Sequence, residues 1–259
     1  MTVSLIISTY NWPQALRLCL ESVMRQTVLP TEILIADDGS GDETREEVER
    51  IAKRSPVPVR HIWQEDDGFR VAMIRNKAIA NSRCDYIVQV DGDMILDRNF
   101  IRDHVVFARR GTYVTGSRGY PTEELTRRIL AGETLPTPFS RGMRNRNNAL
   151  RVPPVSRLYR LLGLRRRARG CNIAFWRDDL VRINGYDETF NGWGWEDTEL
   201  AVRLDNCGIR QQCIRFGGIG YHLYHPKSER PNLEQNEAMC RRSIQERTTR
   251  CEEGLDKYL

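Results

Sequence analysis

The stretch Tyr86-Ile-Val-Gln-Val-Asp-Gly-Asp93 places two carboxylates around a glycine directly after a short apolar run. An apolar run of this length that stops at turn-forming residues predicts a buried β-strand. Carboxylate oxygens suit Mg²⁺ and Mn²⁺, and the glycine lets the backbone approach a ligand closely. The stretch therefore predicts a cation site at a strand end, with a solvated turn as the alternative for these residues alone.

The same order of strand, polar loop and helix occurs three times before this stretch. Short apolar runs over 3–7, 32–36 and 57–63 predict strands, and the segments that follow them have helical spacing or composition. Alternating strands and helices predict an α/β, Rossmann-like fold with a mostly parallel, doubly wound sheet. Ligands bind such sheets beyond the carboxyl ends of the strands. We expect Asp37 and Asp38 to end a strand adjacent to that of Asp91.

Regular signals are fewer in the second half of the chain. Residues 116–169 are rich in Gly, Pro, Asn and Arg, and only 158–164 has helical spacing, which predicts a long, partly mobile excursion. Beyond it the sequence predicts a strand over 172–176, a helix over 178–184, a helix from about Glu196, a strand over 212–216 and a helical tail after Pro226.

The formal net charge of +5 is unevenly distributed. Eleven arginines and no acidic residue lie between Glu133 and Asp178, so the rest of the chain is net negative. These arginines are Arg141, Arg144, Arg146, Arg151, Arg157, Arg160, Arg165, Arg166, Arg167, Arg169 and Arg177. Leucines are interspersed with them over 153–168 at helix-compatible spacing, which favours a peripheral contact between the 141–169 segment and an anionic membrane.

Three other partners of this basic segment stay open. It could bind nucleic acid or pyrophosphate, or form a solvated loop. Nucleic acid is disfavoured because no motif typical of RNA or DNA binding accompanies it. The apolar runs are far shorter than the roughly 20 residues of a membrane span, and the seven cysteines show no CxxC pair. These features favour a cytoplasmic protein, at the inner face of the membrane if the basic segment binds there.

Arg70 and Arg75 follow the turn Asp66-Asp67-Gly68 on the first turns of a predicted helix. Guanidinium groups and a helix N-terminus both suit phosphate oxygens. Ion pairs with the two aspartates of the turn are the alternative.

Several blocks together resemble the family 2 glycosyltransferases of GT-A fold, in particular the subgroup that shares its second half with β-1,4-galactosyltransferases and bacterial chondroitin polymerases. The blocks are Ile6-Ile-Ser-Thr-Tyr-Asn11, Ala36-Asp-Asp-Gly-Ser40, Gly68-Phe-Arg-Val-Ala-Met-Ile-Arg-Asn-Lys-Ala78, Val90-Asp-Gly-Asp-Met94, Gly170-Cys-Asn-Ile-Ala-Phe175, Gly192-Trp-Gly-Trp-Glu-Asp-Thr-Glu199 and Gly220-Tyr-His222. They occur in the family's order between residues 3 and 225.

The resemblance implies a role for each matching position on the donor side. The residues implied to bind the nucleotide sugar are Ser8, Tyr10, Asp38, Arg70, Arg75 and Asp91. Among them, Asp38 matches the position that binds the uracil base. Asp93 and His222 match metal ligands, and His225 is close enough in sequence to replace His222. A histidine beside a carboxylate favours Mn²⁺, with Mg²⁺ as the alternative.

The segment Trp193-Gly-Trp-Glu-Asp197 resembles the family's acceptor loop and general base. Asp197 matches the base that takes the proton of the acceptor hydroxyl. Trp193, Trp195 and Glu196 match acceptor-binding positions, although Trp195 stands where the galactosyltransferase pattern has a second glycine. Taken alone, the acidic pair is also typical of a helix N-terminus, with the tryptophans in the core.

The resemblance implies one GT-A catalytic domain over 1–259. It divides into a nucleotide-sugar-binding half (1–115), a basic, partly mobile insertion (116–169), an acceptor-binding and catalytic half (170–225) and a helical tail (226–259). The implied activity is inverting, metal-dependent transfer from a UDP-sugar to a hydroxyl of a glycan or lipid-linked glycan, as in bacterial surface polysaccharide or lipopolysaccharide synthesis. A nucleotidyl or phosphoryl transferase and a non-catalytic nucleotide-sugar-binding module are the alternatives.

Overall fold

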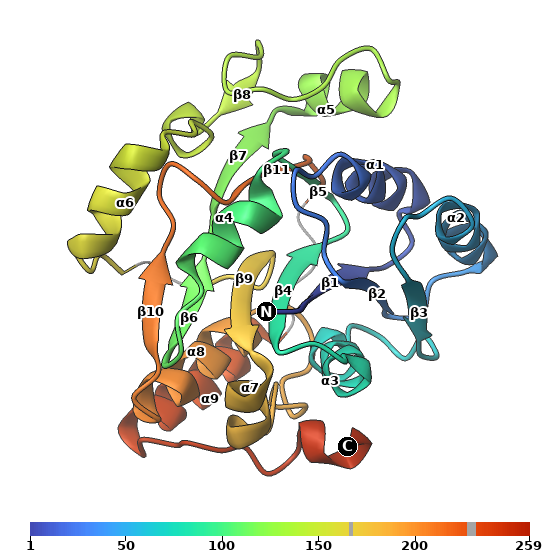
Figure 1. Cartoon of the computed structure of the whole chain (residues 1–259). Coiled ribbons are helices and arrows are strands. Elements are labelled where there is room, and N and C mark those ends of the chain that lie inside the picture. Colours follow the sequence, from blue (N-terminus) through green and yellow to red (C-terminus); the bar gives the residue numbers. More distant parts are fainter. Residues whose placement is uncertain (166–167, 227–231) are drawn as a thin grey trace.

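A computed structural model describes residues 1–165, 168–226 and 232–259 of the chain (Figure 1). Its centre is a seven-stranded sheet in the order β10-β6-β9-β4-β1-β2-β3. The strands are β1 (Val3–Thr9), β2 (Glu32–Asp37), β3 (Val59–Trp63), β4 (Tyr86–Asp91), β6 (Thr112–Thr115), β9 (Asn172–Trp176) and β10 (Arg210–Cys213). Only β9 pairs antiparallel with its neighbours in this sheet, which confirms the mostly parallel α/β fold.

Helices cover both faces of this sheet (Figure 1). One face packs against α1 (Pro13–Met24), α2 (Asp42–Ala52) and α4 (Phe100–Phe107), and the other against α3 (Val71–Asn81), α7 (Arg177–Ile183) and α8 (Glu196–Asn206). Side chains of β1 alternate between the two cores, since Leu5 and Ile7 face the first and Ile6 faces the second. Because helices cover both faces of a doubly wound sheet, its central strands are apolar on both faces, as β1 is.

A second sheet lies beyond the carboxyl ends of β1 and β4, in the order β5-β11-β7-β8 (Figure 1). Its strands are β5 (Met94–Leu96), β7 (Ser117–Pro121), β8 (Met143–Arg144) and β11 (Ile219–His222). Strand β11 runs antiparallel to β5, and its register places His222 opposite Met94. The end of β11 is thereby brought next to Asp93.

The remaining elements are α5 (Glu123–Leu130), η1 (Arg146–Asn148), α6 (Pro153–Leu161), α9 (Leu233–Gln245) and η2 (Leu255–Tyr258). None of the described helices is long and apolar enough to cross a lipid bilayer.

Four expectations about placement were wrong. Residues 116–169 are helical not only near 158–164 but also in α5, whose N-terminus is capped by the Thr122 side chain. Strand β1 lies between β2 and β4, so the strands that end in Asp37 and Asp91 are not adjacent, because the first strand occupies the centre of a doubly wound sheet. Helix α6 begins at Pro153 rather than at 158, since proline is well suited to the first turn of a helix. Strand β10 spans Arg210–Cys213 rather than 212–216, because it pairs with β6 in that register.

Candidate active site

The loops after β1, β2 and β4 meet at the carboxyl end of the large sheet. Ser8 on β1 is in register with Asp91 on β4 and with Ala36 on β2. Asp38 is only 6% exposed, and its carboxylate accepts hydrogen bonds from Gln64 Nε2 at 2.6 Å and from the Arg70 N–H at 2.9 Å. Burial raises the pKa of Asp38 to about 6. Three predicted donor-side residues therefore lie at one end of the sheet.

Tyr10 and Arg70 lie at the outer edge of this region. The Tyr10 hydroxyl donates to Asp66 Oδ2 at 2.8 Å, and its side chain is half exposed. The Arg70 guanidinium pairs with Asp67. Of the two interpretations of Arg70, the ion pair with the turn is the one formed in this structure, and phosphate binding stays a prediction.

Arg75 is the buried cation at the centre of the site, with 4% of its side chain exposed. Its Nε donates to Ser8 Oγ at 3.2 Å, and its two terminal nitrogens pair with Asp91 Oδ1 and Glu196 Oε1, each at 3.1 Å. The guanidinium also lies 5.3 Å from the centre of the Tyr186 ring. One side chain thus connects β1 and β4 to the first residue of α8.

Gly170 leaves the space that Arg75 occupies. A Cβ atom at this position would lie 2.8 Å from both terminal nitrogens of Arg75, so the guanidinium would have to move. The Gly170 N–H donates to Asp197 Oδ2 at 2.7 Å, and its carbonyl accepts from Gln89 Nε2 at 2.9 Å. The glycine therefore allows the buried cation and the predicted base to approach the same loop.

Asp93, His222 and His225 form a cluster whose candidate ligand atoms all lie within 4.8 Å of one another. The Nε2 atom of each histidine is 3.6 Å from Asp93 Oδ2. Each Nδ1 lies near a carbonyl, Leu223 O at 3.1 Å and Pro226 O at 2.8 Å respectively.

The hydrogen bonds of this cluster determine which atoms can bind a cation. A carbonyl only accepts hydrogen bonds, so each Nδ1 carries a proton, and Nε2 of each neutral imidazole is the atom left to bind a cation. Asp93 Oδ1 is buried without a hydrogen-bond partner among the described residues. These groups fit a divalent cation with mixed nitrogen and oxygen ligands, such as Mn²⁺. His222 and His225 both fit as ligands of this cation, whereas from the sequence they were alternatives.

The predicted acceptor loop lies between Arg75 and α9. Trp193 is 36% exposed, and Trp195 adopts φ +76°, a left-handed conformation that favours glycine. Nδ2 of Asn236 on α9 donates to the carbonyls of Asn191 and Gly194, both at 3.1 Å, and so holds the loop in place. The departure from the galactosyltransferase pattern at Trp195 falls where the backbone itself prefers glycine.

The two acidic residues that begin α8 differ in environment. Glu196 is buried. Its pKa is raised by burial and, to a smaller extent, by the neighbouring Asp197, and these two effects outweigh the lowering by Arg75. Its Oε2 has no hydrogen-bond partner in the part of the chain that the structure describes. Asp197 is partly exposed, with Oδ1 accepting from the Thr198 hydroxyl at 3.2 Å and Oδ2 accepting from Gly170. Asp197 is therefore the carboxylate that a substrate hydroxyl can reach.

The basic segment divides into paired and exposed parts. Arg151 pairs with Asp103 at 2.7 Å, and Arg165 pairs with Asp205. Leu158, Leu161 and Leu162 are 58%, 77% and 60% exposed. Arg166 and Arg167 lie outside the described residues. Part of the positive charge of this segment therefore balances acidic residues of the same chain.

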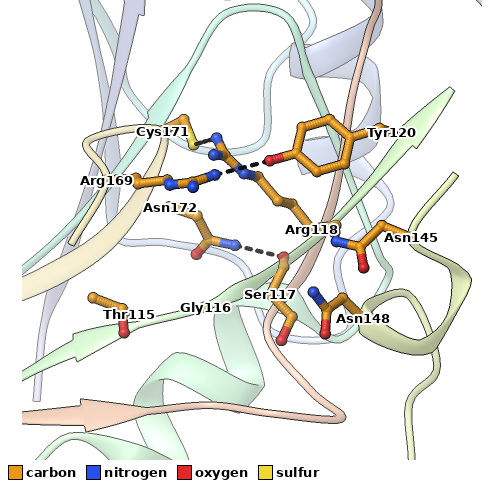
Figure 2. Close-up of a pocket in the computed structure, with 10 residues that line it drawn as sticks. All are labelled: Thr115, Gly116, Ser117, Arg118, Tyr120, Asn145, Asn148, Arg169, Cys171 and Asn172. Atoms are coloured by element: carbon orange, nitrogen blue, oxygen red, sulfur yellow. Dashed lines mark hydrogen bonds between the residues drawn. The ribbon is translucent and has the colours of Figure 1, made fainter. Parts of the chain in front are cut away.

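Sequence reasoning missed two features of the site. Gln64 follows β3 and supports Asp38, and its position at a strand end was the available signal. Arg118 and Tyr120 lie on β7, in a pocket of about 420 Å³ beside Cys171 (Figure 2). No sequence pattern connects β7 with residues 169–172, because the contact is formed only by the fold.

Similar solved structures identify the fold. A mannosyltransferase from Pyrobaculum calidifontis, PcManGT, in complex with GDP-Man and Mn²⁺, has a TM-score of 0.61 at 21% identity over 85% of this chain and 56% of that chain. GalNAc-T7 with UDP, GalNAc and Mn²⁺ has a TM-score of 0.68 at 14% identity over 93% of this chain and 47% of that chain. The fold is the GT-A fold of glycosyltransferases.

The chain belongs to glycosyl transferase family 2, whose sequence profile matches residues 4–167. A second profile, described as the N-terminal domain of galactosyltransferase, matches residues 163–226. The predicted family membership is confirmed, and the two profiles meet within the basic segment.

Curated relatives are longer than this chain. Chondroitin synthase of Pasteurella multocida (strain Pm70) is 25% identical over 248 residues, which cover 88% of this chain and 25% of that protein. Validoxylamine A glucosyltransferase of Streptomyces hygroscopicus subsp. limoneus is 27% identical over 269 residues, which cover 93% of this chain and 56% of that protein. The chain thus spans a quarter to about half of their length.

Proposed function

We propose that this chain is an inverting, metal-dependent glycosyltransferase that moves a sugar from a UDP-sugar to a hydroxyl of a glycan or lipid-linked glycan. The observation that carries the proposal is the contact set of Arg75. This buried guanidinium joins Asp91, at the predicted nucleotide-sugar side, to Glu196, beside the predicted base. Donor and acceptor groups are thereby held at one centre, as transfer between two substrates requires.

The loops after β1 and β2 supply the nucleotide-binding groups of this proposal. In its ionised form the Asp38 carboxylate accepts the N–H of uracil, and the Gln64 and Arg70 hydrogen bonds keep it in place. Ser8 and Tyr10 flank the base and ribose, and Asp91 lies at the ribose side of the cation cluster. Arg70 and Arg75 supply positive charge near the phosphates.

Asp93, His222 and His225 would hold the cation, for which Mn²⁺ fits their mixed ligand set better than Mg²⁺. A bound divalent cation supplies positive charge that stabilises the UDP leaving group. The acceptor side is formed by Trp193 and Trp195, which offer aromatic faces to a sugar ring, and by Glu196.

Asp197 takes the proton of the acceptor hydroxyl as that oxygen attacks the anomeric carbon. The Gly170 N–H fixes one carboxylate oxygen at 2.7 Å and leaves lone pairs for the substrate. Attack from the side opposite UDP inverts the anomeric centre, so an α-linked donor yields a β-glycoside.

Replacement of the base tests this function. Asp197→Asn should lower transfer by about 10²–10⁴-fold, the usual contribution of a general base. UDP affinity, measured calorimetrically with Mn²⁺, should stay within about twofold of wild type, because Asp197 is not among the donor-binding groups. Retained transfer would contradict the proposal. A non-catalytic binding module would bind UDP and show no transfer in wild type, and a nucleotidyl transferase would release pyrophosphate or monophosphate instead of UDP.

We also propose a peripheral contact with anionic membrane through residues 141–169, at the cytoplasmic face that the sequence predicts. The exposed leucines of α6 and its adjoining residues support it. Wild-type protein should sediment with phosphatidylglycerol vesicles and not with phosphatidylcholine vesicles. Leu161→Ser combined with Leu162→Ser should weaken this binding several-fold, whereas Val106→Ser, an exposed apolar control on α4, should not. Equal sedimentation with both vesicles would contradict it.

A further inference from the structure

The pocket beside Cys171 contains two guanidinium groups without a negative group among its lining residues. Figure 2 shows Arg118 and Arg169 side by side between Cys171 and Tyr120, and none of the ten lining residues is acidic. Arg118 donates to Cys171 Sγ at 2.6 Å, and Arg169 donates to the Tyr120 hydroxyl at 3.0 Å. The Cys171 thiol is neutral because burial raises its pKa to about 12. The pocket therefore holds two positive charges that neutral groups position, with the Asp91 carboxylate as a nearby negative charge beyond the lining residues.

Tyr120 orients both arginines. The Arg118 guanidinium lies 5.0 Å from the centre of its ring, while its hydroxyl accepts the hydrogen bond from Arg169. One arginine comes from β7 and the other from the segment that precedes β9. A pair of guanidinium groups fixed in this way offers parallel N–H donors, which match the oxygens of carboxylate or phosphate.

The pocket adjoins the proposed reaction centre on the side away from the uracil site. Gly170, which donates to Asp197, lies between Arg169 and Cys171 in sequence, and the Tyr120 ring is 6.1 Å from the His222 ring. The uracil site is at β1, β2 and β3, whereas the pocket is at β6, β7 and β9, with β4 between them. A group bound here therefore lies beside the proposed base and away from the nucleotide base.

From this geometry we infer that Arg118 and Arg169 bind an anionic group on the acceptor glycan, either the carboxylate of an acidic sugar or the phosphate of a phosphorylated one. This inference rests on the proposed function, because it assigns the ligand to the acceptor. It explains why the arginine-rich segment ends beside the catalytic loop: its last arginine before Gly170 supplies half of the site.

Three matched tetrasaccharides test the inference by binding. They differ only at C6 of the terminal sugar, which carries a carboxylate, a neutral hydroxymethyl group or a phosphate ester. In titrations with wild-type protein, UDP and Mn²⁺, the carboxylate or phosphate glycan should bind at least about tenfold more tightly than the neutral one, given the strength of charge-assisted hydrogen bonds. Whichever anion binds more tightly identifies the source of the negative charge.

Two arginine variants make the test specific. Arg169→Gln should abolish the preference for the anionic glycan, and its exposed position keeps the fold unaffected. Arg157→Gln, an exposed arginine of the same basic segment outside the pocket, should retain the preference. Equal affinity for the three glycans, or binding of none, would overturn the inference. A tenfold loss of UDP affinity in Arg169→Gln would also overturn it, because the pocket would then bind the donor phosphates.

The same titration separates this inference from the proposed function. Wild-type protein that binds UDP with Mn²⁺ but shows no anion preference disproves the inference alone. Wild-type protein that fails to bind UDP under these conditions contradicts the proposed function itself.

Discussion

The proposed donor and acceptor sides of the site are built in different ways. The donor side lies at the ends of β1, β2 and β4, whose register alone brings Ser8 level with Asp91. The proposed acceptor side is assembled from β7, the segment before β9 and the start of α8, which are far apart in sequence. Sheet geometry thus fixes the donor groups, whereas a few long-range contacts fix the acceptor groups. Arg75 is the contact that joins the two sides.

Replacement of Arg75 should have the largest effect of the predicted changes. Arg75→Met would leave Asp91 without its ion pair and Glu196 as a buried carboxylate without its cation. Breaking a buried ion pair by removing one partner costs about 3–5 kcal/mol. The free energy of unfolding in urea should fall by that amount. Arg50→Met on α2, which removes an ion pair whose arginine is exposed, is the control and should change stability far less. Equal effects of the two variants would show that the two sides are not coupled through Arg75.

The donor side should respond to pH through Asp38, whose pKa is raised by burial to about 6. Its ionised form accepts the uracil N–H, so UDP affinity should fall about tenfold between pH 7 and pH 5 as the carboxylate becomes protonated. Stability changes in the opposite direction. The folded state holds this proton to higher pH than the unfolded chain does, so ionisation of Asp38 opposes folding as pH rises from 3.8 to about 6.

Comparison with Asp38→Asn isolates this effect from the titration of the UDP phosphates and the histidines. Calorimetric titrations at both pH values should show a smaller change in UDP affinity for the variant. If wild type and variant change in parallel, Asp38 does not contact the base.

Of the three substitutions, Trp195→Gly on the proposed acceptor side should have the smallest effect. Its left-handed backbone costs about 1 kcal/mol for a residue other than glycine, so Trp195→Gly relieves strain while it increases the freedom of the unfolded chain. We expect stability within about 1 kcal/mol of wild type and UDP affinity within about twofold. The KM for the acceptor should rise several-fold because an aromatic face is lost. An unchanged acceptor KM would remove Trp195 from the acceptor site.

The contrast between the two sides also explains how much the sequence could predict. Apolar runs that stop at polar residues identified β1, β2 and β4, and with them Ser8, Asp38 and Asp91. The motif Glu196-Asp197 was correctly predicted to begin a helix, since acidic residues favour the first turn. The central position of β1 was missed because strand order depends on the path of the whole chain.

Other parts of the site had no local signal. The pairing of Arg75 with Glu196 joins residues 121 positions apart, and hydrophobic periodicity carries no information about such a contact. The pocket between β7 and residue 169 depends on the same kind of long-range packing. For the histidines, the sequence left His222 and His225 as alternatives, and only the fold shows that both Nε2 atoms lie 3.6 Å from Asp93 Oδ2.

The measurement that tests the central claim most directly is UDP binding with and without Mn²⁺, in wild type and in Asp93→Ala. The claim is that one cation site couples the donor nucleotide to the residues brought in by β11. Wild type should bind UDP at least about tenfold more tightly with Mn²⁺, and Asp93→Ala should lose this gain, because a ligand truncation removes much of the metal affinity. UDP affinity that is independent of Mn²⁺ in wild type, or a gain that survives in Asp93→Ala, would contradict the account.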